Sequence, residues 1–364
     1  MKSTLGYICG TDSWGGLEMN QLRNALWMHE RGQKVFLICL ENSPIAKNAT
    51  EAGIATIYIQ KHRKYFDFKQ GKALAKIIQQ HKITHLLVRA IHDMSISVIA
   101  KREVKSLHLS YFMEMQLGVK KNNFLHTLRF SYFDLWACPL NWLSNQVKTM
   151  TRFDHANIKV IPSGLDLLQF EEQLDKSEAR TKLDLPQDKI LFGLIGRFDR
   201  HKGQLLLLEA LQLCQNQEVG IVLLGEPTRN EGSNYAEQMT EFISANQLID
   251  RVFIRPFRKD IVVFYKAVDW FVMASKAETF GMVTIEAMAC GTPTLGSNAG
   301  GTPEILKFGE LGVLFESLNA ADLASKMNEI INGKHPIDPQ NLIQTAQYYD
   351  HHKVCEQVEK ALGL

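Results

Sequence analysis

The sequence predicts an α/β protein with two doubly wound domains that face a cleft. Short apolar runs alternate with helix-like segments along the whole chain, which is the pattern of buried strands in parallel sheets. The length of 364 residues suits about two domains. Charge also divides the chain: residues 1–165 carry 22 Lys and Arg against 11 Asp and Glu, a net of +11, whereas residues 166–364 carry 19 against 28, a net of −9.

The first half begins with an apolar strand and a glycine-containing loop, followed by a helix predicted over residues 17–31. A second helix is predicted over 141–150. The strands of this half are predicted from apolar runs at residues 5–10, 33–40, 54–59, 84–89, 107–112, 133–139 and 158–161.

The second half repeats the alternation, and we place the domain boundary at 165/166, ahead of a charged stretch that ends near 186. Strands are predicted at 190–195, 219–224, 252–254, 270–273, just after Pro293, and at 312–315. Helices are predicted at 204–214, 235–246, 260–267, 282–289, 320–331 and 339–362.

Composition excludes several classes of protein. No run of about eighteen apolar residues is present, so no membrane-spanning helix is expected. The start, MKSTLGYICG, has the pattern of a first strand rather than of a signal peptide. The six cysteines are scattered without a C-x-x-C pair, which indicates reduced core residues of a cytoplasmic protein.

The basic half contains two segments that mix cations with aromatic residues. Residues 61–82 are basic and amphipathic and include Tyr65, Phe66 and Phe68. They fit either a contact with an anionic membrane or a solvated helix face beside a loop. A second such patch at 120–132 fits either an acceptor-binding surface or a core helix.

Residues 277–305 carry the clearest chemistry. Gly281 precedes a predicted helix, whose first amides and positive dipole end suit a phosphate. Glu286 lies about 6 Å further along the axis at ~1.5 Å per residue, where a carboxylate can accept hydrogen bonds from ribose hydroxyls. Glu278 precedes the helix and can reach a sugar at the other end of a diphosphate. The spacing predicts a nucleotide-sugar site; the plain alternative is a glycine-punctuated turn with two solvated glutamates.

This stretch resembles the Glu-x7-Glu motif of the retaining glycosyltransferases of family 4, which have the GT-B fold of two Rossmann-like domains. The shared residues are Phe280-Gly281, the run from Glu286 to Pro293, and Gly300-Gly301-x-Pro303-Glu304. The resemblance implies that residues 1–165 form an acceptor-binding domain and 166–344 a donor-binding domain. It also implies that the helix within 345–364 packs back on the first domain.

Roles for the donor site follow from the resemblance. Glu286 would hold the ribose, Glu278 would orient the donor sugar, and the stretch from Phe280 to the amides of Met282 and Val283 would meet the diphosphate. The Gly-Arg…Lys-Gly element of the family matches Arg197 and Lys202, whose cations suit a leaving diphosphate.

The remaining site residues are weaker matches. Arg255 and Phe257 fall where the family forms the pocket for the nucleotide base, largely through backbone contacts. Gly15 and Gly16 resemble the glycine loop that approaches the diphosphate.

His92 follows a predicted strand and is a candidate catalytic residue, or else a structural histidine. The histidine that the family commonly has after the strand at 107–112 is missing here. Two alternatives follow: Glu114 or Gln116 takes over its polar contacts, or the enzyme relies on His92.

The predicted activity is transfer of a sugar from a UDP- or GDP-sugar to a glycan or lipid-linked, anionic acceptor. The setting expected for it is lipopolysaccharide, capsule or glycolipid assembly at the inner face of the membrane. The chain has no Asp-x-Asp pair, so no metal cofactor is expected, and no nucleic-acid-binding motif is present. The alternatives are a nucleotide-sugar epimerase of the same fold and a non-catalytic glycan- or lipid-binding protein. A dinucleotide-dependent oxidoreductase is disfavoured, because no G-x-G-x-x-G follows the first strand.

Overall fold

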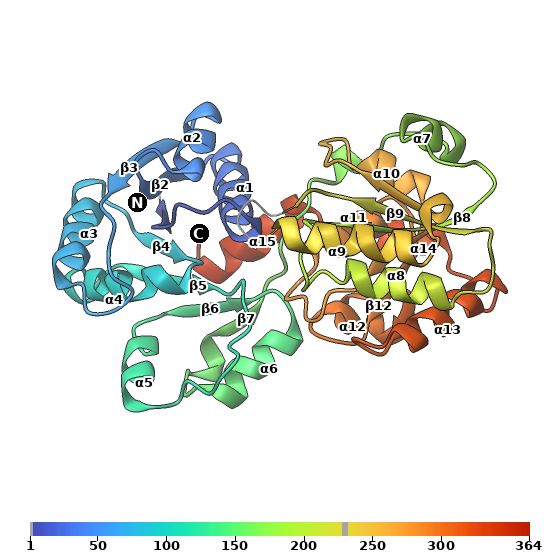
Figure 1. Ribbon diagram of the computed structural model, residues 1–364. Helices are drawn as coiled ribbons and strands as arrows, with labels where there is room; N and C mark the ends of the chain where they lie inside the picture. Colours follow the sequence, from blue (N-terminus) through green and yellow to red (C-terminus); the bar gives the residue numbers. More distant parts are fainter. Residues whose placement is uncertain (1–2, 228–231) are drawn as a thin grey trace. The chain divides into compact units, whose positions relative to one another are not determined.

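The computed structural model describes residues 3–227 and 232–364, and the chain forms two compact units (Figure 1). Unit 1 comprises the described residues up to Gly164 together with His351–Leu364. Unit 2 comprises Leu165–Asp350. Each unit is built on one parallel sheet.

Unit 1 has a seven-stranded sheet in the order β3-β2-β1-β4-β5-β6-β7. Its first strand is buried along its whole length, which explains its unbroken apolar run. The strands are β1 Thr4–Cys9, β2 Lys34–Leu40, β3 Ala55–Ile59, β4 His85–Val88, β5 His108–Phe112, β6 Leu135–Cys138 and β7 Ile158–Val160.

The helices of unit 1 pack on both faces of this sheet. On one face α1 and α15 lie side by side (Figure 1). Arg31, the C-cap of α1, pairs with Glu359 of α15 at 2.7 Å. The helices are α1 Gly16–Glu30, α2 Pro44–Glu51, α3 Phe68–Gln80, α4 Met94–Glu103, α5 Phe124–Phe130, α6 Asn141–Met150 and α15 His351–Leu362, with the 3₁₀ turns η1 Ile91–Asp93 and η2 His155–Asn157.

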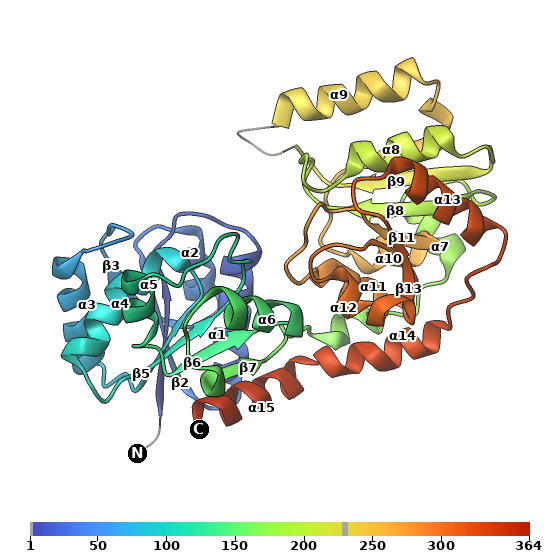
Figure 2. The ribbon, with the colours of Figure 1, turned by 90° about the horizontal axis from the view of Figure 1, so that it is seen from below.

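Unit 2 has a six-stranded sheet in the order β10-β9-β8-β11-β12-β13. Helix α9 lies on the outer side of α8 (Figure 2). The strands are β8 Ile190–Ile195, β9 Val219–Leu224, β10 Val252–Arg255, β11 Trp270–Met273, β12 Thr294–Ser297 and β13 Gly312–Phe315. The helices are α7 Lys176–Lys182, α8 Gln204–Leu213, α9 Gly232–Ala245, α10 Val262–Ala267, α11 Met282–Ala289, α12 Thr302–Ile305, α13 Ala320–Ile331 and α14 Pro339–Ala346, with the 3₁₀ turns η3 Leu167–Phe170, η4 Ile249–Arg251, η5 Lys307–Gly309 and η6 Gln347–Tyr349.

The strand order fixes where ligands can bind. In unit 1 the order reverses between β1 and β4, and in unit 2 it reverses between β8 and β11. Loops that leave the carboxyl ends of such neighbouring strands diverge to opposite faces and leave a crevice, the usual ligand site of an open α/β sheet. The loops after β8 and β11 contain the residues from Arg197 to Lys202 and from Glu278 to Gly281.

Several elements differ from the sequence-based prediction. The four-residue helix α12 was not predicted, and neither were the longer helices α2, α4 and α7. Seven of the ten residues of α4 are buried, so the helix lacks the polar face that periodicity detects. Helices α2 and α7 are short, with caps at Ser43 and Asp175 that accept hydrogen bonds from the first turn. The helix predicted over 339–362 is α14 and α15, separated by η6 and Asp350.

All six cysteines are buried and free of disulfides, so their predicted place in the core is confirmed. Among the described residues, no helix has the length and apolar character needed to cross a membrane.

Candidate functional site

Glu278 lies in the loop after β11, and its backbone holds it in place. It forms an isolated parallel bridge with Gly300, and the Gly301 amide donates a hydrogen bond to the Glu278 carbonyl at 2.8 Å. Gly300 has φ +65°, and a Cβ there would lie 2.3 Å from the same carbonyl oxygen. Only glycine fits this approach, so Gly300-Gly301 fixes the position of Glu278.

Lys202 reaches the Glu278 carboxylate from the loop after β8. Its Nζ lies 3.0 Å from Glu278 Oε2, and the two side chains are 36% and 21% exposed. The loop is supported from behind, because Gly203 (φ +81°) lies so close to Ala274 that a Cβ would be 2.3 Å from the Ala274 carbonyl oxygen. Both charges therefore remain accessible to a ligand from solvent.

Helix α11 begins beside this ion pair. Gly281 is its N-cap in the left-handed region (φ +79°), and a Cβ there would approach Glu278 Cγ to 3.1 Å. Within the described part of the chain, the amides of Met282 and Val283 donate no hydrogen bond. The helix therefore presents two unbonded donors and its positive dipole end next to the Lys202–Glu278 pair, which is an arrangement that suits a phosphate.

Glu286 projects from the second turn of α11 and is 9% exposed. Its Oε2 accepts a hydrogen bond from the Tyr265 hydroxyl at 2.9 Å. Burial, helped by the nearby Glu286 charge, raises the pKa of Tyr265 well above its usual value. The phenol therefore stays protonated and holds the carboxylate in one orientation.

Arg197 lies two residues after the end of β8 and is exposed. Its backbone is fixed, because Gln204 Nε2 donates to the Arg197 carbonyl at 2.8 Å and Gln204 itself is fully buried. Among the residues that the structure describes, the Arg197 guanidinium makes no hydrogen bond or ion pair. It is thus a cation on a rigid loop with its donors available.

The other predicted residues of unit 2 have different surroundings. Phe280 is buried edge-on against Tyr349, at 5.9 Å between ring centroids, and so supports the loop before α11. Arg255 donates to the Leu183 carbonyl at 2.6 Å and also to Asp184, so its guanidinium ties β10 to the turn after α7. Phe257 is 59% exposed.

In unit 1, Gly15 is the N-cap of α1. Its amide donates to Glu18 Oε2 at 3.0 Å, while Thr11 Oγ1 donates to the other oxygen of Glu18 at 2.9 Å. A Cβ at Gly15 would meet only Glu18 Oε2, at 3.6 Å, and one at Gly16 would meet nothing within 4 Å. Packing within unit 1 thus does not require glycine at either position, and it is Glu18 that organises the loop.

His92 belongs to a cluster at the carboxyl ends of β1 and β4. Asp93 is fully buried and accepts hydrogen bonds from His62 Nε2 at 2.9 Å and from the Gly10 amide at 3.0 Å. His92 Nδ1 lies 3.7 Å from Asp93 Oδ1, the oxygen that faces His62, and the His92 side chain is 37% exposed. The donor atoms of the two histidines and Asp93 lie within 4.8 Å of one another, close enough for a metal ion.

The protonation of His62 follows from its partners. Its Nδ1 faces the Arg63 carbonyl at 3.2 Å and its Nε2 faces Asp93, and both partners are acceptors. Burial lowers the pKa of His62, but the hydrogen bonds with Asp93 and Arg63 outweigh it and raise the pKa above its usual value. Both ring nitrogens of His62 face acceptors, an arrangement that favours the protonated ring beside Asp93.

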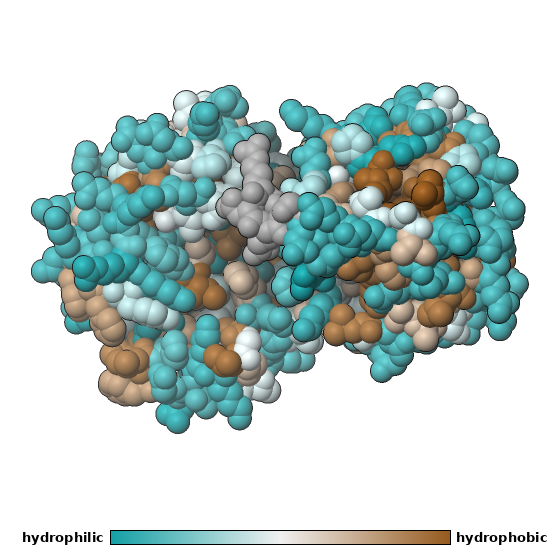
Figure 3. Space-filling view, in the orientation of Figure 1, coloured by the Kyte–Doolittle hydropathy of each residue, from teal (hydrophilic) through white to brown (hydrophobic). Residues whose placement is uncertain are grey.

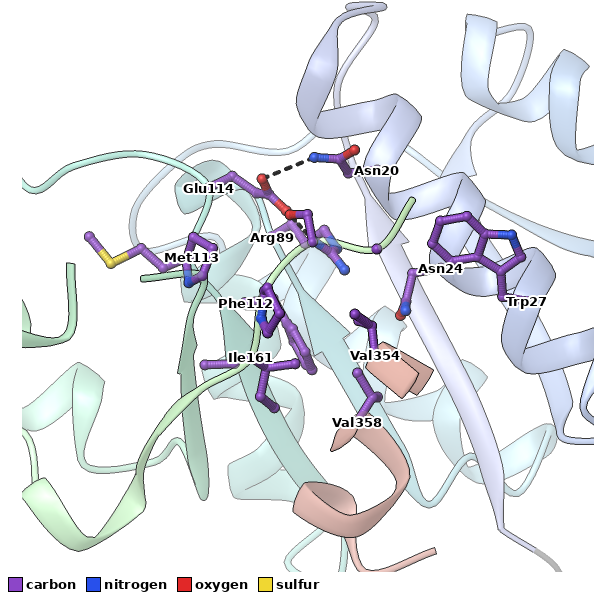
Figure 4. A pocket seen from close by; sticks show the side chains of 15 residues that line it. Asn20, Asn24, Trp27, Arg89, Phe112, Met113, Glu114, Ile161, Val354 and Val358 are labelled. Carbon is purple, nitrogen blue, oxygen red and sulfur yellow. Dashed lines mark hydrogen bonds and ion pairs between the residues drawn. The ribbon is translucent and has the colours of Figure 1, made fainter. Parts of the chain in front are cut away.

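A pocket of unit 1 next to α15 contains a second buried ion pair (Figure 4). Arg89 at the end of β4 pairs with Glu114, and Asn20 Nδ2 donates to Glu114 Oε2 at 3.3 Å. The Arg89 guanidinium also lies 5.2 Å from the Phe112 ring centroid. Glu114 thus points into this pocket, whereas Gln116 is exposed.

Several residues of these sites were not predicted from the sequence. Tyr265, His62 and Arg89 carry no local signal, because each acquires its partner only through strand order or helix packing. Glu18 had a signal, since an acidic residue three positions after an N-cap is typical of a capping box.

Comparison with known sequences supports the resemblance to glycosyltransferases. Residues 175–348, all within unit 2, match the family described as glycosyl transferases group 1. A D-inositol 3-phosphate glycosyltransferase of Mycolicibacterium smegmatis is 30% identical over 193 residues, which cover 52% of this chain and 43% of that protein. The chain thus spans less than half the length of the curated relatives that it matches.

Solved structures share the fold over the whole chain. Anabaena Alr3699/HepE in complex with UDP has a TM-score of 0.86 at 20% identity, covering 99% of both chains. A glycosyltransferase from Rickettsia africae has a TM-score of 0.86 at 19% identity, covering 99% of this chain and 98% of the other. The predicted α/β fold with two Rossmann-like sheets is therefore confirmed.

Proposed function

We propose that the protein is a retaining glycosyltransferase of family 4 that transfers a sugar from a UDP- or GDP-sugar to an acceptor hydroxyl without a metal ion. The observation that carries this proposal is the grouping in unit 2 of the Lys202–Glu278 pair, the unbonded amides at the start of α11 and the uncommitted Arg197. Together they offer two cations, a helix N-terminus and a carboxylate on the loops that follow the neighbouring strands β8 and β11, which suits a sugar diphosphate.

In this proposal donor binding rearranges the Lys202–Glu278 pair. The diphosphate takes Lys202 as a point charge and Arg197 as a bidentate donor, and its oxygens accept hydrogen bonds from the amides of Met282 and Val283. Glu278, released from Lys202, accepts hydrogen bonds from the hydroxyls of the donor sugar. As the sugar–phosphate bond breaks, negative charge grows on the diphosphate, so these donors stabilise the transition state more than the ground state.

Glu286 is proposed to hold the ribose. Its carboxylate is oriented by Tyr265, so it offers acceptor capacity in a fixed direction about one helical turn from the phosphate-binding amides. Uridine is the first base to test, because Anabaena HepE, which has the same fold, was solved with UDP and with UDP-glucose. Base contacts would fall to the backbone around Phe257, since the Arg255 side chain is engaged in the scaffold.

Retention of anomeric configuration would follow from attack on the face that the diphosphate leaves, with a phosphate oxygen taking the acceptor proton. No protein nucleophile is assigned. The acceptor is proposed to bind unit 1, where His92 is half exposed at the carboxyl end of β4.

The net charge of +11 on residues 1–165 favours an anionic acceptor, glycan or lipid-linked, and peripheral contact with an anionic membrane. Relatives named D-inositol 3-phosphate glycosyltransferases support an acceptor that carries phosphate. We place the reaction in the cytoplasm at the inner membrane face, in lipopolysaccharide, capsule or glycolipid assembly.

Calorimetric titration with UDP, GDP and ADP tests the donor site. We expect one nucleotide to bind, Glu286→Ala to weaken it, and Glu310→Ala, which removes an exposed carboxylate of the same unit, to leave it unchanged. Absence of binding by all three nucleotides and by intact nucleotide-sugars would refute the proposal. Nucleotide released only when an acceptor is present indicates transfer. An epimerase would convert the donor sugar without an acceptor, and a non-catalytic binder would release nothing.

A further inference from the structure

Unit 1 carries an apolar groove that the proposed donor chemistry does not use. It has a volume of about 360 Å³ and lies between the segment before α3, helix α4 and helix α5. This volume is within the range of pockets that bind small molecules, ~300–1,000 Å³. Its lining is mostly apolar and includes Phe66, Phe68, Val98, Ile99, Leu125 and Leu128.

Several apolar side chains around the groove are largely exposed to solvent. Phe66 is 69% exposed, Phe68 54% and Leu125 61%, and Phe124 beside them is 75% exposed. Figure 3 shows hydrophobic surface over α5 and beside α4, the helices that line the groove. A contiguous apolar patch of this kind marks an interaction site more often than isolated exposed residues do.

Phe66 is also held in an unusual backbone conformation. Its φ of +55° lies in the left-handed region, which a bulky residue rarely adopts. Exposed Phe308 of unit 2 has the same φ, so this conformation does not by itself mark an interaction site; what distinguishes Phe66 is its place in the groove.

Cations surround the groove. Arg129 lies 5.4 Å and Lys64 5.5 Å from the Tyr65 ring centroid, and Arg102 lies 6.0 Å from that of Tyr132. Across residues 3–227 and 232–364, none of these three cations forms an ion pair with a carboxylate.

We propose that this groove docks unit 1 on an anionic lipid bilayer, with one hydrocarbon chain of an acidic phospholipid in the groove and its phosphate among Lys64, Arg102 and Arg129. The ligand must combine hydrocarbon with negative charge, and an acidic phospholipid does both. The tyrosines beside the cations match the amphipathic residues that occupy the membrane–water interface. The inference deepens the membrane contact of the proposed function and is independent of the donor site.

Vesicle flotation tests the apolar contact. We expect wild type to bind vesicles that contain about one third phosphatidylglycerol and to ignore pure phosphatidylcholine. Phe66→Ser and Leu125→Ser should each weaken binding about tenfold, because each withdraws a large apolar side chain from the bilayer. Leu125 lies in a regular helix, so its variant keeps the test valid if the Phe66 variant does not fold. The matched control is Phe308→Ser in unit 2, since Phe308 is 78% exposed and has the same φ of +55°.

The charge contribution is tested separately. Lys64→Gln and Arg102→Gln should each weaken vesicle binding about fivefold, because one basic residue near an anionic surface contributes ~1 kcal/mol. Lys334→Gln, which removes an exposed cation of unit 2, should have no effect. Dodecyl phosphate below its micellar concentration should bind the wild-type protein, and Phe66→Ser should weaken this binding. Inorganic phosphate at equal concentration should not bind.

Wild type that does not bind anionic vesicles overturns the proposal, and so does equal binding by the Phe66, Leu125 and Phe308 variants. Loss of self-association in the Phe66 variant, measured by sedimentation velocity, would instead assign the patch to a second copy of the chain. UDP titration of the same variants should match wild type. Failure of UDP binding would therefore count against the donor site and leave the groove unaffected.

Discussion

Replacing Gly300 with alanine tests whether backbone geometry holds the donor-site carboxylate. The added Cβ would lie 2.3 Å from the Glu278 carbonyl oxygen and 2.8 Å from the Glu278 nitrogen. Gly333 provides the matched control, because it has a similar φ of +73° but open space around the added Cβ. The pair of variants separates the cost of the left-handed backbone from the cost of the clash.

The structure sets the expected magnitudes. An alanine in the left-handed region costs ~1–2 kcal/mol at either position. Overpacking at Gly300 adds ~1–3 kcal/mol, since the neighbouring atoms are backbone and cannot rotate away. We therefore expect Gly333→Ala to lower the free energy of unfolding by ~1–2 kcal/mol and Gly300→Ala by ~2–5 kcal/mol in urea titrations.

The clash should also reach the site. Relief of the contact moves the Glu278 backbone, breaks the 2.8 Å bond from the Gly301 amide and shifts the carboxylate away from Lys202. Titration with UDP-glucose should therefore show weaker binding in folded Gly300→Ala and wild-type binding in Gly333→Ala. Equal destabilisation by the two substitutions, or wild-type affinity in the Gly300 variant, would refute the reasoning.

Three further predictions concern single side chains. If Lys202 acts as proposed, Lys202→Ala should lower kcat/KM for transfer by ~10²–10³, because a cation is lost beside the leaving diphosphate. The same substitution should change the free energy of unfolding by less than ~1 kcal/mol, because the ion pair is partly exposed. Tyr265→Phe should cost ~1.5–3 kcal/mol of stability in urea unfolding and weaken UDP binding, since Glu286 loses its buried hydrogen bond; wild-type UDP affinity would separate Glu286 from the nucleotide.

The pKa of His62 is raised above 6.5, so its contribution to stability is complete below that pH and is lost as pH rises through the folded-state pKa. Burial raises the pKa of Asp93, but its hydrogen bonds bring it below 3.8, so its contribution is lost as pH falls through the folded-state pKa. Thermal unfolding measured as a function of pH should therefore show the greatest stabilisation by this pair between the folded-state pKa values of Asp93 and His62. His62→Gln should flatten the dependence of stability on pH.

The strands were predictable because the sheets are parallel and covered on both faces, so each strand is a continuous apolar run. Strands β1 and β9 are buried at every residue, and both were found within a residue of their predicted bounds. Helix α4 could not be predicted from periodicity, because a helix that is buried nearly all round has no periodic polar face.

Part of the candidate site could be predicted from the sequence and part could not. The loop that carries Glu278 could be predicted because its geometry demands glycine at Gly281 and Gly300, and glycine is visible in a sequence. Tyr265 and Arg89 could not be predicted, because their partners Glu286 and Glu114 lie 21 and 25 residues away and meet them only in the folded unit.

The two units use different structural features for the binding that we propose for each. The proposed donor contacts of unit 2 rest on backbone positions where Gly203 and Gly300 pack against the backbone of a neighbouring segment and Gly281 has a positive φ. The apolar groove and the Arg89 pocket of unit 1 are lined largely by side chains. Variants of unit 1 should therefore alter acceptor or membrane binding at constant UDP affinity, and variants of the glycines in unit 2 should do the opposite. A Phe66 variant that weakened UDP binding, or a Gly300 variant that weakened vesicle binding, would show that the two recognition tasks are coupled.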